Sequence, residues 1–405
     1  MSTSEGRPTE DDDEPDIAFP IERGESGVGE RAARLCHRIA RAVAAAGPSG
    51  WDRVDAVFTL TTTTETVRVR YVDEHGRSMR VHPGPEVLAP VREHRRLSAG
   101  LGEGPWWRML FTLTREGAIE VDFDYGDEPF PDDQLFAPEV YAADLEAYPR
   151  TRLPVWLAAY IRHDGRQTRT AQQAAAQARA DLAEGARAVA TDELPALPLL
   201  WGRWAVLAAA FVAIGAPRGP RILPALGFFE GRRRCGATLY TLPGGRAVLS
   251  GGVWDAPELD AVYNRGAADP RLYRGAPDWV ADPVLNPRAG NGLLTFCYWW
   301  ESDRWCRGES PGPDAFAAAL PEVWSAEAVV DRICRLALTD PTADQRAALF
   351  ALTAAAENAA VTRNTLVAAL AGYDGIDFDI DGAYYQLVMA GVTEMPVAAP
   401  QIAAP

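Results

Sequence analysis

The sequence contains no lysine, so all of its positive charge comes from arginine. It has only five histidines and five cysteines in 405 residues. No apolar run approaches the ~18 residues of a transmembrane helix, so no membrane partner is expected. The histidines lack metal-site spacing, which predicts no metal site. The sequence has neither a Walker loop nor a dinucleotide fingerprint, so no cofactor is expected. The cysteines are scattered along the chain and odd in number, which suits a reducing cytosol rather than a disulfide framework. We therefore expect a cytoplasmic protein.

The net charge of −16 is unevenly distributed along the chain. Residues 1–30 contain ten acidic residues against Arg7 and Arg23, a net charge of −8, and the remainder carries the other −8. The first residues also lack the basic region and apolar core of a secretory signal. An acidic chain disfavours binding to duplex DNA or to an anionic membrane. We expect no nucleic-acid partner.

The pattern of apolar residues predicts an α+β protein with two modules. In the first, residues 30–165, helices flank an antiparallel sheet. In the second, residues 194–395, an apolar helix precedes another antiparallel sheet, and the C-terminal part is helical. Residues 166–193, rich in Ala, Gln and Arg, are predicted to form a helical connector. The leader 1–28 and the tail 396–405 are expected to be disordered.

The most informative segment, residues 104–130, is predicted to form a β-hairpin with its turn at Glu116-Gly117. Apolar residues alternate along both strands and define one buried face. The opposite face carries a row of carboxylates with only Arg115 nearby: Glu120, Asp122, Asp124, Asp127 and Glu128. Like charges along one strand face repel each other. We interpret this row as a surface for a basic partner.

Asp374–Asp381 has the spacing of the Asp-Gly-x-Asp-x-Asp-x-Glu strand of family 18 chitinases. Those enzymes need Glu as the acid where this chain has Asp381, so a glycoside hydrolase is the less favoured alternative. A calcium loop would need a bidentate Glu where Val388 stands. We interpret the segment as an exposed acidic turn between two helices.

The second module is rich in aromatic residues. Trp299 and Trp300 lie in a predicted strand and must point to opposite faces of the sheet. Either one of them is exposed as a partner contact beside Arg304 and Arg307, or helices cover both faces, which we favour.

Several short motifs of the first module occur in a defined order. They are Trp51 at the start of a strand, the Pro105-Trp106 corner, Glu116-Gly117 before Val121–Tyr125, and Tyr148-Pro149-Arg150 before Pro154-Val155-Trp156. Over residues 30–165 the chain resembles the YezG-like immunity family of bacterial polymorphic toxin systems. The resemblance implies a non-enzymatic cytoplasmic protein that binds and neutralises a cognate secreted toxin domain, a nuclease or another nucleotide-targeting enzyme.

Combining the carboxylate row with this resemblance gives a hypothesis for the partner-binding residues. Carboxylates would occupy phosphate positions in a basic toxin site, and Trp106 or Trp107 would be the apolar anchor. The proposed set is Trp107, Asp122, Asp124, Asp127, Glu128, Asp132 and Asp133. The alternative is an adaptor or chaperone of a specialised secretion system that binds through the aromatic second module.

Overall fold

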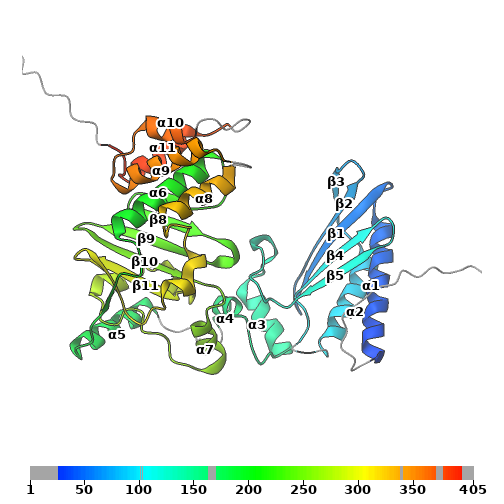
Figure 1. The fold of residues 1–405 in the computed structure, drawn as a ribbon. Helices are drawn as coiled ribbons and strands as arrows, with labels where there is room; N and C mark the ends of the chain where they lie inside the picture. Colours follow the sequence, from blue (N-terminus) through cyan, green and yellow to red (C-terminus); the bar gives the residue numbers. More distant parts are fainter. Residues whose placement is uncertain are drawn as a thin grey trace, which may run out of the picture. The chain divides into compact units, whose positions relative to one another are not determined.

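A computed structural model describes the chain over residues 26–100, 102, 104–162, 170–337, 341–370 and 377–394. These residues form two compact units, divided between Arg152 and Leu153. Each unit has its own antiparallel sheet, flanked by helices (Figure 1). The α+β class predicted from the sequence is therefore confirmed.

Unit 1 is built on a five-stranded sheet with the order β3-β2-β1-β4-β5. Its strands are β1 (Trp51–Leu60), β2 (Glu65–Asp73), β3 (Ser78–Val81), β4 (Arg108–Thr114) and β5 (Ile119–Asp124). Its helices are α1 (Ser26–Ala46), α2 (Pro85–Ser98), α3 (Pro138–Ala147) and the 3-10 turn η1 (Asp132–Gln134). The predicted hairpin is thus confirmed as β4 and β5.

The two faces of this sheet differ as the alternation predicts. Met109 and Phe111 of β4 are buried in one core with residues of α1 and α2, which cover this face (Figure 1). The opposite face is polar. The β4–β5 turn closes where the Thr114 N–H donates to the carbonyl of Ala118 at 3.0 Å, and Gly117 supplies a positive φ of 91°. One buried and one polar face is the usual arrangement of an antiparallel sheet.

Unit 2 is built on a seven-stranded sheet with the order β6-β12-β11-β10-β9-β8-β7. Its strands are β6 (Val189–Thr191), β7 (Arg221–Leu223), β8 (Leu226–Glu230), β9 (Gly236–Leu242), β10 (Arg246–Gly252), β11 (Phe296–Glu301) and β12 (Arg304–Arg307). Its α-helices are α4 (Val155–Tyr160), α5 (Ala171–Ala183), α6 (Leu197–Ala213), α7 (Pro257–Arg265), α8 (Ala326–Ala337), α9 (Ala343–Glu357), α10 (Arg363–Ala369) and α11 (Ile380–Met389). Its 3-10 helices are η3 (Arg232–Arg234), η4 (Asp278–Ala281), η5 (Pro287–Asn291) and η6 (Pro313–Ala319).

Helix α6 is the centre of the larger core of unit 2. Its residues are apolar apart from Arg203, which pairs with Glu357 of α9. The helix packs against α8, α9 and α11 as well as against the sheet, as a buried helix does. Gly202 permits the close approach of α9, since a Cβ at this position would lie 2.7 Å from the carbonyl oxygen of Ala356. No helix in the described part of the chain has the length and apolar character needed to cross a membrane.

The segment predicted as a connector is part of unit 2. Ala174 and Ala178 of α5 are buried in a second core on the other face of the sheet, and β6 pairs with β12. Helix α4, which the sequence analysis placed in the first module, also falls in unit 2. Alanine is small, so a packed alanine-rich helix carries little amphipathic signal in its sequence. This is why α5 resembles a solvated connector.

The two adjacent tryptophans of β11 are both buried. Trp300 is 7% exposed and lies in the core around α6, whereas Trp299 is 1% exposed and lies in the core around α5. The favoured interpretation, in which both sheet faces are covered, is confirmed, and an exposed tryptophan contact at this position is wrong. Cys297 is buried beside Trp299, and burial raises the pKa of its thiol.

His94 makes the stability of unit 1 depend on pH. It is buried in α2, its Nδ1 accepts a hydrogen bond from Trp106 Nε1 at 3.1 Å, and its ring stacks on Phe123. Burial lowers the pKa of His94 to about 4 from 6.5. The unfolded chain therefore takes up a proton at a higher pH than the folded chain, and stability is lost as the pH falls from about 6.5 to about 4.

We predict that this histidine reduces the unfolding free energy by ~3 kcal/mol over that interval. The measurement is urea unfolding at pH 7.5, 5.5 and 4 for the native chain and for His94→Gln, whose amide oxygen can still accept from Trp106. The variant should lose less stability on acidification. Equal losses in the two proteins would show that His94 does not contribute.

Candidate partner-binding surface

The predicted acidic residues fall into two groups in the structure. Six are exposed: Glu120 and Asp122 on the polar face of β5, Asp127 and Glu128 in the following loop, and Asp132 and Asp133 in η1. Strand β5 is at the edge of its sheet. Glu120 lies opposite Thr112, and Asp122 lies opposite Leu110. These two carboxylates, two residues apart on the same face, are hereafter called the acidic strand face.

Asp124 is the partly buried member of the set, and both it and the exposed Asp133 pair with an arginine of unit 1. The register of the hairpin places Arg108 opposite Asp124, and Arg108 Nη1 lies 2.6 Å from Asp124 Oδ2. Burial raises the pKa of Asp124. Asp133 pairs with Arg68 of β2. The expectation that Arg115 is the only nearby cation is therefore wrong. The largely buried Arg108–Asp124 pair links β4 to β5, whereas the Arg68–Asp133 pair is exposed.

Trp106 and Trp107 are both fully buried. Trp106 lies in the core between the sheet and α2. Trp107 makes edge contacts with Phe130 and Tyr141, and the guanidinium of Arg150 lies 3.5 Å from the centre of its ring. The expectation that Trp107 is an exposed apolar anchor is therefore wrong. The backbone of Trp107 lies between β1 and β5, since its N–H donates to the carbonyl of Asp124 and its carbonyl accepts from the Leu60 N–H. Both tryptophan rings are buried in the protein.

Asp144 of α3 is the acceptor that fixes this corner. Its carboxylate accepts from Arg95 Nη2 at 2.7 and 2.9 Å, from the Thr62 N–H at 2.7 Å and from Trp107 Nε1 at 2.9 Å. The Arg95 and Asp144 side chains are 6% and 2% exposed. Sequence reasoning missed this cluster. Its members lie far apart in the chain and share no motif. The one possible signal was Asp144 itself, because an aspartate on the buried side of a helix needs a hydrogen-bond or charge partner.

The described part of the Asp-rich C-terminal segment has a structural role. Asp379 caps α11 by accepting from the Gly382 N–H at 2.8 Å, and Asp381 pairs with Arg363. Asp374, Gly375 and Ile376 lie outside the described residues. No group of three or more His, Cys, Asp or Glu residues is placed to hold a metal in the described part of the chain.

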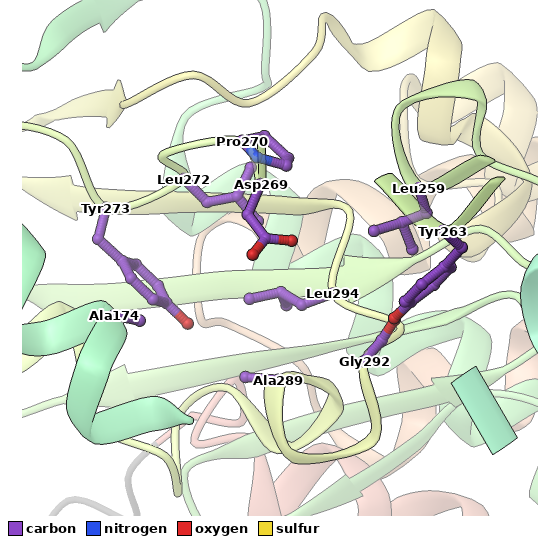
Figure 2. Close-up of a pocket in the computed structure, with 10 residues that line it drawn as sticks. All are labelled: Ala174, Leu259, Tyr263, Asp269, Pro270, Leu272, Tyr273, Ala289, Gly292 and Leu294. Carbon is purple, nitrogen blue, oxygen red and sulfur yellow. The ribbon is translucent and has the colours of Figure 1, made fainter. Parts of the chain in front are cut away.

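Unit 2 contains a small cavity of about 70 Å³. Figure 2 shows Tyr263 and Tyr273 on opposite sides of it, with the carboxylate of Asp269 pointing between them. The Tyr263 hydroxyl donates to the carbonyl of Gly292 at 2.6 Å, and burial raises the pKa of Tyr263. Ligand pockets usually enclose ~300 Å³ or more, so this cavity is too small for an ordinary ligand.

No protein-family model matches the chain, and no curated protein matches it at a significant level. The interpretation of the acidic strand face therefore depends on its own geometry and on the sequence motifs.

Asp144→Asn should lower the unfolding free energy of unit 1 by ~3–5 kcal/mol, because Arg95 then remains buried without a counter-charge. Asp133→Asn is the matched control. It removes a carboxylate from an exposed ion pair with Arg68, for which a change of at most ~1 kcal/mol is expected. Chemical unfolding followed by tryptophan fluorescence measures both. Similar small effects would contradict a central role for Asp144.

Proposed function

We propose that this protein is a non-catalytic immunity protein that binds and neutralises a cognate toxin domain in the cytoplasm. In this proposal the acidic strand face meets a basic surface of the toxin. The sequence motifs shared with YezG-like immunity proteins support the class of function. The charge arrangement on the polar sheet face supports the location of the interface.

The decisive observation concerns which carboxylates on this face have a partner. Asp55 of β1 pairs with Arg53 and Arg70, both at 2.8 Å, and Asp124 pairs with Arg108. Glu120 and Asp122 lie on the same face but have no ion pair within the described residues. Two like charges about 7 Å apart repel each other, and a cationic partner would remove that repulsion.

The edge position of β5 supports the same location. Because Thr114 bonds to Ala118, the even-numbered residues of β5 exchange hydrogen bonds with β4. The backbone groups of Ile119, Val121 and Phe123 therefore point away from the sheet. A partner segment could bond to this edge while its basic side chains meet Glu120 and Asp122.

This geometry suits a nuclease or another nucleotide-targeting enzyme as the partner. The active sites of such enzymes attract phosphates, and carboxylates can occupy the same positions. Complementary charge also accelerates association, in a manner that added salt suppresses. The adaptor alternative depended on an exposed aromatic surface in unit 2, and the burial of Trp299 and Trp300 gives it no support.

The test uses Glu120→Arg with Asp122→Arg, and the probe is the toxic domain encoded by the neighbouring reading frame. Like charges placed across an interface cost several kcal/mol, so affinity should fall about a hundredfold or more. Protection of cells that co-express the toxin should be lost. In the native protein the association rate should decrease with salt, and in the variant this dependence should weaken or reverse.

The control variant is Glu74→Arg with Glu146→Arg, which makes the same charge change at exposed positions of unit 1 away from β5. It should bind and protect like the native protein. If both variants bind equally well, the interface lies elsewhere. If the native protein does not bind the domain at all, the immunity function itself is wrong.

A further inference from the structure

A second cavity lies within unit 1, between the β1–β2 turn and α2. Its volume is about 600 Å³, within the ~300–1,000 Å³ range of small-molecule sites. The turn contributes the four consecutive threonines 61–64, and α2 contributes three arginines. The other polar lining residues are Glu65 and Tyr148.

Arg95 is the fixed part of this lining. Its side chain is 6% exposed. Nη2 donates to both oxygens of Asp144, and Nε donates to the carbonyl of Trp106 at 3.0 Å. The remaining nitrogen, Nη1, has no hydrogen-bond partner among the described residues. It is nevertheless not fully buried, so solvent or a ligand can reach it. A buried guanidinium thus keeps one accessible donor where it lines the cavity.

The other two arginines differ in their availability. Arg92 forms a two-nitrogen ion pair with Glu65, with Nε at 2.8 Å from Oε2, so these charges offset each other. Arg96 is exposed, and its Nε makes a weak contact with the carbonyl of Arg92 at 3.4 Å. No carboxylate pairs with Arg96 in the described part of the chain. Its terminal nitrogens are therefore available to a ligand.

The threonine turn is held in position by the same carboxylate as Arg95. The Thr62 N–H donates to Asp144 Oδ1. Thr61 and Thr64 bond to each other through the Thr61 hydroxyl and both backbones. The exposed Thr62 and Thr63 hydroxyls make no hydrogen bond within the described residues. Donors from two guanidinium groups and two hydroxyls are more than a single carboxylate ligand needs, and they suit the three terminal oxygens of a phosphoryl group.

We propose that this cavity binds a small organic phosphate. Arg95 Nη1 and the Arg96 guanidinium donate to the phosphoryl oxygens, and the threonine hydroxyls complete the hydrogen bonding. The cavity is much larger than a phosphate ion, so the organic part of the ligand fills the space beside Tyr148. This site involves neither Glu120 nor Asp122 and is independent of the proposed immunity function.

Calorimetric and NMR titrations of the full chain in phosphate-free buffer test the proposal. The probes are adenosine 5′-monophosphate, inorganic phosphate and adenosine. The nucleotide should bind at least about tenfold more tightly than inorganic phosphate, and adenosine should not bind detectably. The amide signals of residues 61–64 should shift on binding. If neither phosphate-containing probe binds, the proposal fails. If inorganic phosphate binds as tightly as the nucleotide, the site accepts a free ion rather than an organic phosphate.

Arg96→Gln and Arg80→Gln form the matched pair of variants. Both arginines are exposed and lack an ion pair within the described residues, but Arg80 lies on β3 and does not line the cavity. Arg96→Gln should weaken nucleotide binding about tenfold, the equivalent of ~1.4 kcal/mol, with no loss of folding by circular dichroism. Arg80→Gln should bind like the native protein. Equal weakening in both variants would indicate nonspecific charge attraction and overturn the proposed site.

Discussion

One buried carboxylate organises unit 1. Asp144 accepts hydrogen bonds from the side chain of Arg95, the backbone of Thr62 and the ring of Trp107, so a single group joins α2, the β1–β2 turn, the start of β4 and α3. A buried charge is tolerated only when paired and hydrogen-bonded. Losing one partner leaves the others partly unsatisfied, and the four segments therefore depend on one another for their positions.

This arrangement determines which surfaces remain for recognition. Because Trp107 donates to Asp144, the tryptophan corner is interior and cannot serve as an apolar contact. Recognition on the polar sheet face therefore depends on charged side chains. Asp55 and Asp124 have arginine partners, whereas the acidic strand face has none among the described residues. The same carboxylate uses only Nη2 of Arg95, which leaves Nη1 for the threonine cavity.

Much of unit 1 was predictable because its signals are local. The bounds of β4 and β5 follow from strict alternation and a glycine turn. The Arg108–Asp124 pair was predictable in principle, since counting back from the turn places these residues opposite each other. In contrast, Arg68–Asp133 and Arg95–Asp144 join residues 65 and 49 positions apart. No periodic pattern encodes such pairs. The packing of α5 was also hidden, because buried alanines and solvated alanines look alike in sequence.

Unit 2 shows why aromatic content is a poor guide to an interface in this protein. A strand that is buried on both faces has a continuous apolar sequence. Two adjacent tryptophans in such a strand pack into two different cores, one on each face of the sheet. Trp300 packs on Trp305 with ring centres 5.3 Å apart, whereas Trp299 belongs to the core of the opposite face. In an antiparallel sheet with one exposed face, by contrast, the residues available to a partner are the polar ones in the alternating pattern. In β5 that half consists of Glu120, Asp122 and Asp124, and the arginine opposite the third distinguishes a structural carboxylate from the two that can meet a partner.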